Sequence, residues 1–342
     1  MDKYVVRLYG MFSYINTLGF RMDVHMKIEV LLYSFNGVDF LGEQLQSILK
    51  QDISGKAEIS ISVYDDGSTD KTKDILERYQ NEKKLTFTEG NGLGKTVGYW
   101  DLMKNAGEAD YYAFCEQDDV WFPEKLSRAV KYIETQAILD GEDTELSTGP
   151  MLYVSDYTVT NAKLKPIRFT RNKACKYSDV EHNLLYSSSP GCTFVFNDAA
   201  RKKFLMYDPA TSYPDNYDDL AKKIINLTGK VVIDRVPTVY RRKHKGDRFS
   251  PEYYGGFTGA VKLYKELFFG KKPNAKSETA KALAFVYADE IKDDSRKTEA
   301  LQQVGEYRDD QVNRERLLQN SRFVVGDYND KWLKMAVKKN KL

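Results

Sequence analysis

The alternation of strands and helices in this chain is clearest in one stretch, Ile59-Ser60-Ile61-Ser62-Val63-Tyr64-Asp65-Asp66-Gly67-Ser68-Thr69-Asp70. Its first half is apolar and β-branched at alternate positions, which predicts a short strand over Ile59–Tyr64. Its second half consists of turn and helix N-cap residues, so a helix is expected over about Lys71–Asn81. The stretch therefore predicts a strand that ends in acidic residues and leads directly into a helix.

The same alternation of strand and helix occurs four times in the first 139 residues. Strands are expected at Ile28–Tyr33, Ile59–Tyr64, Leu85–Thr88 and Tyr111–Cys115, and helices at Phe40–Gln51, Lys71–Asn81, Val97–Ala106 and Glu124–Leu139. This order predicts an α/β fold with a mostly parallel sheet flanked by helices.

The pattern loosens after Gly141 and becomes helical toward the C-terminus. We expect strands at Met151–Ser155 and Thr193–Asn197, a helix at Tyr217–Leu227, edge strands at Val231–Ile233 and Thr238–Tyr240, and charged helices from Phe257 onward. Three segments are predicted: an N-terminal extension (1–26), a catalytic domain (27–250) and a helical C-terminal region (251–342). An ordinary helix packed on the core is an equal alternative for the extension.

The composition excludes several classes of protein. The 52 basic and 50 acidic residues give a net charge of +2, whereas a nucleic-acid-binding domain is usually plainly basic. Three cysteines and three histidines are too few for a disulfide framework or a Cys-rich zinc site. No apolar run approaches the ~20 residues that span a bilayer. A cytoplasmic globular protein is expected.

Two acidic clusters follow the predicted strands, Asp65-Asp66 after the second and Glu116-Gln117-Asp118-Asp119 after the fourth. Ligands of open α/β sheets bind outside the carboxyl ends of the strands. Carboxylates gathered there repel one another, and a divalent cation that carries a diphosphate would relieve the repulsion, because Mg²⁺ and Mn²⁺ favour carboxylate and phosphate oxygens. The alternative is a pair of solvated turns.

The loop Gly90-Asn91-Gly92-Leu93-Gly94-Lys95-Thr96 resembles a phosphate-binding P-loop but fails on spacing. Glu89 stands where that motif requires its first glycine, so a kinase or NTPase is not expected. Lys95 is a candidate phosphate contact from a neighbouring loop, and a solvated loop lysine is the alternative.

Six short segments, in this order and spacing, are typical of one enzyme family: Ser34-Phe35-Asn36-Gly37, Glu43–Ile48, Asp65–Asp70, Glu116–Trp121, Gly191-Cys192-Thr193 and Tyr240–His244. On these segments, residues 27–250 resemble the family 2 glycosyltransferases, which are inverting, use nucleotide sugars and have a GT-A fold (a Rossmann-like nucleotide-diphospho-sugar transferase fold). They most resemble the bacterial rhamnosyltransferase-like branch.

The resemblance implies roles for individual residues. Nucleotide binding is implied for Ser34, Asn36, Asp65, Asp66, Lys95 and Glu116, and binding of Mn²⁺ or Mg²⁺ for Asp118 and His244. Further candidates near these positions are Asp119, Trp121 and Arg241. Glu116 departs from the Asp that begins the family's Asp-any-Asp motif, which puts the ribose contact and the tightness of the metal site in question. A surface histidine in a charged loop is the alternative for His244.

The resemblance also implies a general base that takes the proton of the acceptor hydroxyl. Counting back from Gly229 places this base at Asp218, with Asp215 and Asp219 as the other candidates. The neighbouring Asp219 would raise the pKa of Asp218 by like-charge repulsion. An acidic first turn, which the helix macrodipole favours, is the alternative reading of the same residues.

The implied reaction transfers a sugar from a nucleoside diphosphate sugar to a saccharide or lipid-linked acceptor during surface-polysaccharide synthesis. L-rhamnose from dTDP-rhamnose is the first choice, and a UDP-hexose or UDP-N-acetylhexosamine is the second. A non-catalytic nucleotide-sugar or glycan-binding protein is an alternative of another class.

Two segments near the C-terminus mix lysines with bulky apolar residues, Phe257–Phe269 and Lys331–Lys339. Such segments bind the interface of an anionic membrane, which would suit a lipid-linked acceptor and a peripheral location on the inner face of the cell membrane. The alternatives are helices packed on the catalytic domain and a contact between two copies of the chain.

Overall fold

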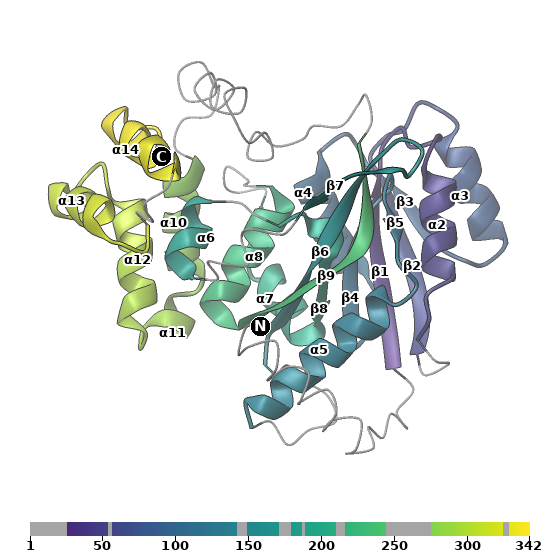
Figure 1. The fold of residues 1–342 in the computed structure, drawn as a ribbon, viewed down its shortest axis with the longest axis horizontal. Helices are drawn as coiled ribbons and strands as arrows, with labels where there is room; N and C mark the ends of the chain where they lie inside the picture. The colour runs from purple at the N-terminus through teal and green to yellow at the C-terminus, as the bar shows by residue number, and fades with distance from the viewer. Residues whose placement is uncertain are drawn as a thin grey trace.

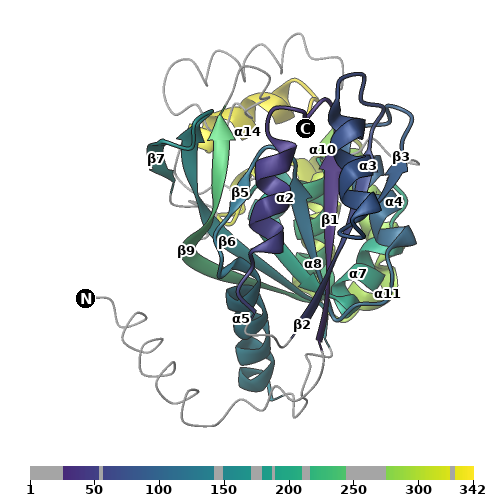
Figure 2. The ribbon, with the colours of Figure 1, turned by 90° about the vertical axis from the view of Figure 1, so that its right-hand side faces the viewer.

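The computed structural model describes residues 26–53, 57–141, 149–170, 179–186, 189–209, 216–243, 275–323 and 328–342. These residues form one nine-stranded sheet with helices on both faces (Figures 1 and 2). The strands are β1 (Met26–Ser34), β2 (Ala57–Asp65), β3 (Thr86–Glu89), β4 (Tyr111–Glu116), β5 (Val120–Trp121), β6 (Met151–Asn161), β7 (Pro166–Thr170), β8 (Phe194–Asn197) and β9 (Lys230–Lys243).

The helices of the first half are α2 (Leu41–Leu49), α3 (Thr72–Asn81), α4 (Lys95–Asn105) and α5 (Lys125–Leu139). They are followed by α6 (Val180–Leu185), the 3₁₀ turn η2 (Gly191–Thr193), α7 (Asp198–Leu205) and α8 (Tyr217–Thr228). The C-terminal helices are α10 (Ala275–Val286), α11 (Ala288–Ile291), α12 (Ser295–Gly305), α13 (Gln311–Gln319) and α14 (Tyr328–Lys338).

The sheet order is β3-β2-β1-β4-β8-β6-β9-β5, with β7 added to β6. Strands β3, β2, β1 and β4 are parallel, as the alternation predicts, whereas β8, β7 and β5 pair antiparallel with their neighbours. The parallel register places Ser34 opposite Asp65 and Tyr33 opposite Glu116. The carboxyl ends of β1, β2 and β4 therefore lie together at one edge.

Alternate residues of β1 point to two separate cores. Val30 and Leu32 pack with α2, α3 and α5 on one face, while Leu31 and Tyr33 pack with α4, α7 and α8 on the other. The second core continues without a break into the C-terminal helices through fully buried residues such as Leu283. The helical C-terminal region is thus packed onto the sheet domain through a shared core.

Two sequence-based expectations for the second half are wrong. Val231–Ile233 and Thr238–Tyr240 are parts of one long strand, β9, and this strand lies inside the sheet, between β6 and β5. The residues between them include Pro237, which predicts a break, but a shift of register against β6 at this point accommodates the proline.

For the segment Lys331–Lys339 the structure supports the alternative of a helix packed on the protein itself. Leu333, Ala336 and Val337 of α14 are buried in the core, so the apolar side of this helix packs on the molecule itself. The segment Phe257–Phe269 lies outside the described residues. None of the described helices is long and apolar enough to cross a bilayer.

Candidate active site

The candidate site is built on three acids that follow β4. Glu116 ends the strand, and Asp118 and Asp119 lie in the turn before β5; we refer to these three residues as the acidic edge. The negative charge of Asp118 acts to raise the pKa of both Glu116 and Asp119, so the three acids affect one another electrostatically. The three acids lie at the sheet edge where the sequence predicts them, and their role in binding a ligand stays a prediction.

Lysine and arginine side chains balance part of this charge. The Lys95 ammonium, at the first residue of α4, donates to Glu116 Oε2 at 2.6 Å. Burial lowers the pKa of Lys95, but Glu116 and Asp118 outweigh burial and raise it above its ordinary value. The Arg241 guanidinium lowers the pKa of Glu116 and counteracts the upward shifts of Asp119 and Asp218. Lys95 and Arg241 are therefore both part of the site.

Asp119 is the most buried of the three acids, at 2% exposure. One carboxylate oxygen accepts from the Arg242 amide at 3.3 Å, and Oδ2 has no hydrogen-bond partner among the described residues. Burial, followed by the charges of Asp118 and Glu116, raises the pKa of Asp119 to about 8. A buried carboxylate oxygen without a donor is a place where a cation would be stabilising.

The acidic edge fits a divalent cation in its donor chemistry. Its carboxylate oxygens suit Mg²⁺ or Mn²⁺, which usually bind one or two carboxylates and complete their coordination with phosphate and water. Three ligand-type side chains in metal-binding geometry are not found among the described residues. His244, the other predicted ligand, lies outside those residues. Of the two predicted metal ligands, Asp118 is therefore the one that lies in the described part of the chain.

The predicted nucleotide-binding acids are already bonded to their own loops. Asp65 accepts from the Ser68 amide at 3.0 Å and from its hydroxyl at 2.5 Å. Asp66 accepts from the Tyr33 hydroxyl at 2.6 Å and from the amides of Leu93 and Gly94 at 3.0 and 2.8 Å. These carboxylates therefore shape the loops beside the acidic edge, and their contact with a nucleotide stays a prediction.

The loop after β1 is fixed by hydrogen bonds to Gln117 and Ser68. Ser34 Oγ and the Phe35 amide donate to Gln117 Oε1 at 2.8 and 2.9 Å, and the amide of Asn36 donates to Ser68 Oγ at 2.8 Å. A Cβ on Gly37 would lie 2.1 Å from the same Gln117 oxygen, so a larger residue there would displace the Gln117 amide from its bonds with Ser34 and Phe35. Phe35 is 46% exposed and offers an apolar face beside the acidic edge. No individual role for Gln117 or Phe35 is evident from the sequence.

Asp218 is the second residue of α8, and the residue before it, Tyr217, is bonded to Glu116 of the acidic edge. Its carboxylate accepts from the Gly191 amide at 3.2 Å and from the Asp219 amide at 2.9 Å. Burial raises the pKa of Asp218 to about 8, and the charges of Asp219 and Glu116 act in the same direction. Such a pKa suits a general base near neutral pH. Asp215, another candidate, lies outside the described residues.

Trp121 does not face the site. It is buried in the core, and its ring lies against the Lys125 ammonium, 4.9 Å from the ring centroid. Trp121 is therefore a packing residue in this structure rather than a surface for a ligand.

Arg242 holds the acidic edge in place, a role beyond those expected from the sequence. Its side chain donates to the carbonyl oxygens of Asp118 and Ala162 at 2.9 and 2.5 Å and forms an ion pair with Glu43. Arg241 and Arg242 are adjacent on a strand, so their side chains point to opposite faces of the sheet. If one face is covered by the protein, one of the two arginines must be buried, and this is the sequence signal for Arg242. Arg242 thereby ties β9 to the turn that carries Asp118.

Replacing Arg242 by methionine should lower the free energy of unfolding by about 2–4 kcal/mol, because the buried guanidinium no longer donates to the two carbonyl oxygens. Glu43→Gln is the matched control, since Glu43 is 59% exposed and an exposed pair contributes at most ~1 kcal/mol. Urea unfolding measures both variants. Equal losses in the two would show that the ion pair, rather than the carbonyl contacts, is what matters.

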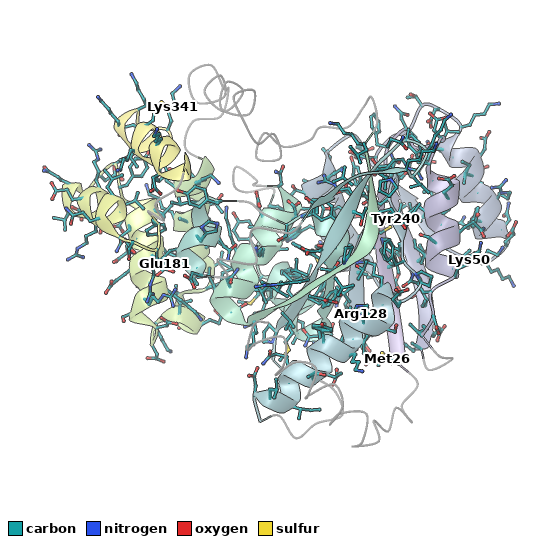
Figure 3. The ribbon with its side chains drawn as sticks, viewed as in Figure 1. Met26, Lys50, Arg128, Glu181, Tyr240 and Lys341 are labelled. Carbon is teal, nitrogen blue, oxygen red and sulfur yellow. The ribbon has the colours of Figure 1, made fainter. Side chains whose placement is uncertain are left out.

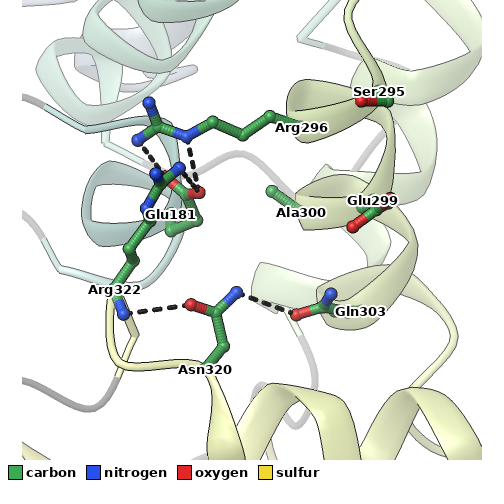
Figure 4. Close-up of a pocket in the computed structure, with 8 residues that line it drawn as sticks. All are labelled: Glu181, Ser295, Arg296, Glu299, Ala300, Gln303, Asn320 and Arg322. Atoms are coloured by element: carbon green, nitrogen blue, oxygen red, sulfur yellow. Dashed lines mark hydrogen bonds and ion pairs between the residues drawn. The ribbon is translucent and has the colours of Figure 1, made fainter.

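A separate polar cavity of about 340 Å³ lies on the helical side of the molecule (Figures 3 and 4). Buried Glu181 of α6 accepts two hydrogen bonds from Arg296, both at 2.8 Å, and one from Arg322 at 3.1 Å. Asn320 donates to Gln303 at 3.2 Å. These contacts join α6 to the C-terminal part of the chain and balance the charge of Glu181.

The fold defines the class of protein: it is a GT-A glycosyltransferase fold. Staphylococcus aureus TarS residues 1–349, solved in complex with UDP-GlcNAc, matches with a TM-score of 0.54. The match covers 92% of this chain and 90% of that chain at 17% identity, a level that shows the fold alone.

The chain belongs to glycosyl transferase family 2, whose family model matches residues 29–178. The dTDP-rhamnosyl transferase RfbG of Shigella flexneri is 32% identical over 228 residues, which are 63% of this chain and 72% of that protein. An uncharacterized glycosyltransferase of Rickettsia typhi is 25% identical over 196 residues, 56% of each chain. The chain spans about half the length of the Rickettsia and Nostoc relatives that it matches.

Proposed function

We propose that this chain is an inverting glycosyltransferase that uses the acidic edge to bind a nucleoside diphosphate sugar and Asp218 as its general base. One observation carries the proposal: the first turn of α8, which holds Asp218, is bonded to Glu116 of the acidic edge through the Tyr217 hydroxyl at 2.7 Å. The base and the predicted donor site therefore lie side by side, as a direct transfer between donor and acceptor requires.

In the proposed reaction the acceptor hydroxyl oxygen forms a bond to the anomeric carbon, while the bond from that carbon to the diphosphate breaks. Asp218 accepts the hydroxyl proton, and Lys95 lies where its ammonium can approach the leaving diphosphate. A divalent cation bound by Asp118, with His244 as a further ligand, would neutralise charge on that diphosphate. Asp65, Asp66, Ser34 and Asn36 form the nucleotide side.

The donor proposed first is dTDP-L-rhamnose, and the supporting observation is the similarity to RfbG, which is named a dTDP-rhamnosyl transferase. UDP-sugars are the second choice, because TarS is named a β-N-acetylglucosaminyltransferase and is solved with UDP-GlcNAc. The acceptor proposed is a saccharide or lipid-linked saccharide of a surface polysaccharide, reached from the inner face of the membrane. A second copy of the chain stays a candidate partner.

The test is a panel of nucleoside diphosphate sugars, with release of the nucleotide followed by mass spectrometry in the presence of Mn²⁺ or of a chelator. We expect one donor to be consumed only with the metal present. Asp118→Ala should lower that rate by at least about 10²-fold, because the leaving group loses its charge neutralisation. Asp140→Ala, which removes a carboxylate at the end of α5, is the control and should act like wild type.

Turnover that survives both chelation and Asp118→Ala would overturn the metal assignment. A chain that binds UDP or dTDP but consumes no donor of the panel would instead be a non-catalytic nucleotide-sugar-binding protein.

A further inference from the structure

Glu116 lies between the two halves of the proposed site, and each of its carboxylate oxygens is bound by a different element. Oε2 accepts from Lys95 of α4 at 2.6 Å, on the side proposed for the donor. Oε1 accepts from the Tyr217 hydroxyl at 2.7 Å, and Tyr217 is the first residue of α8, directly before Asp218. A single carboxylate thus connects the donor side to the helix that carries the base.

The Tyr217 ring is fixed by dense packing. Its centroid lies 4.1 Å from that of Tyr99 in a stacked arrangement, and the edge of Phe114 lies against it at 5.4 Å between centroids. A Cβ on Gly191 would lie 2.2 Å from the Tyr217 ring, so the chain that donates to Asp218 runs directly over this ring. Tyr217 therefore has one position, and its hydroxyl determines where the first turn of α8 stands relative to Glu116.

We propose that Tyr217 is a positioning residue that, through Glu116, holds the Asp218 carboxylate in register with the donor side of the site. This inference rests on the proposed function. Tyr217 touches neither donor nor acceptor in this account; it acts through Glu116 and through the first turn of α8. Lys95 occupies the other oxygen of Glu116, so the donor side keeps its own anchor when the Tyr217 hydroxyl is removed.

The two hydrogen bonds of the Glu116 carboxylate, one from Tyr217 and one from Lys95, form a bridge between the two halves of the site. Removing each of them is expected to change a different kinetic constant. Tyr217→Phe keeps the packed ring and removes only the hydroxyl, so the base is held less accurately while the donor side is retained. We expect kcat to fall about 10–100-fold with the donor KM within about threefold of wild type, because small displacements of a catalytic group cost this much. Lys95→Met should instead raise the donor KM, because a contact with the diphosphate is lost.

The control is Tyr287→Phe, which removes a fully buried hydroxyl that donates to the Lys203 carbonyl at 2.7 Å, far along the chain in the C-terminal helices. The two Tyr→Phe variants should lose similar thermal stability, and only Tyr217→Phe should lose kcat. Steady-state kinetics with the donor found in the panel measure kcat and the donor KM of each variant. Melting curves measure the thermal stability of each variant.

The outcomes separate the two proposals. An active wild-type protein whose Tyr217→Phe variant keeps the kcat of Tyr287→Phe, or changes mainly in donor KM, overturns the bridge alone. A wild-type protein that consumes no donor overturns the proposed function and the bridge with it.

Discussion

Asp218→Asn is expected to lower the turnover of this protein by about 10²–10⁴-fold and to leave its fold and nucleotide binding intact. General-base catalysis is worth about this much, and the asparagine amide cannot accept the proton of the acceptor hydroxyl. The Gly191 and Asp219 amides donate to different oxygens of Asp218, so the asparagine carbonyl keeps one of these two hydrogen bonds and the side chain keeps its size and position.

The stability of Asp218→Asn should be at least that of wild type. The pKa of Asp218 is raised in the folded chain above its ordinary value, so the ionised carboxylate destabilises the fold as the pH rises toward 8. Removing the charge removes this cost, as is common for active-site residues.

Asp219→Asn is the matched comparison, because it removes a neighbouring carboxylate from the same helical turn. Its expected loss of turnover is below tenfold and comes only from a changed charge beside Asp218. A larger loss for Asp219→Asn than for Asp218→Asn would contradict the assignment and would make Asp219 the base. Calorimetric titration with UDP and dTDP shows whether each variant still binds nucleotide.

Lys125→Met is expected to stabilise the protein by about 2 kcal/mol at pH 6.5. Lys125 is fully buried at the start of α5, and its ammonium has no hydrogen-bond partner in the described part of the chain. Burial lowers its pKa from 10.5 to about 8, which corresponds to a cost of about 3 kcal/mol for the charged form. Loss of the contact with the Trp121 ring offsets about 1 kcal/mol of the gain.

The pH dependence gives the sharper test of this second prediction. Between pH 8 and 10.5 the unfolded chain binds a proton at Lys125 that the folded chain does not, so wild-type stability rises with pH in this window. The advantage of Lys125→Met should therefore shrink by at least half between pH 6.5 and 9.5.

Lys50→Met, at an exposed lysine labelled in Figure 3, is the control for the loss of one positive charge. It should change the free energy of unfolding by less than about 0.5 kcal/mol at both pH values. Urea unfolding of the three proteins is the measurement. A destabilised Lys125→Met variant would show that the ammonium has a favourable role in the folded chain.

The first half of the fold could be predicted from the sequence because its periodicity is strong. Strands β1 and β4 are apolar runs buried on both faces, β2 alternates apolar with polar residues over its first half, and each of the three ends in polar residues. The second half could not be predicted as well. β9 continues through Pro237 only because β6 tolerates a shift of register, and this is a property of the neighbouring strand.

The candidate site shows the same limit. The sequence places Glu116, Asp118 and Asp119 after one strand, and the structure brings them together as expected. The sequence could not reveal that Tyr217, 101 residues after Glu116, donates a hydrogen bond to it, because that contact depends on how α8 packs against α4 and β4. The sequence also could not reveal that the Asp66 carboxylate accepts hydrogen bonds from the glycine-rich loop, because these bonds depend on where the loop lies in the folded chain.

Asp218 as the general base is the central claim, and the pH dependence of the transfer step tests it most directly. We expect the single-turnover rate of the wild-type protein to rise about tenfold per pH unit from pH 5.5 and to reach a plateau above about pH 8, where the Asp218 carboxylate is ionised. A rate that is constant between pH 5.5 and 9 would contradict the claim.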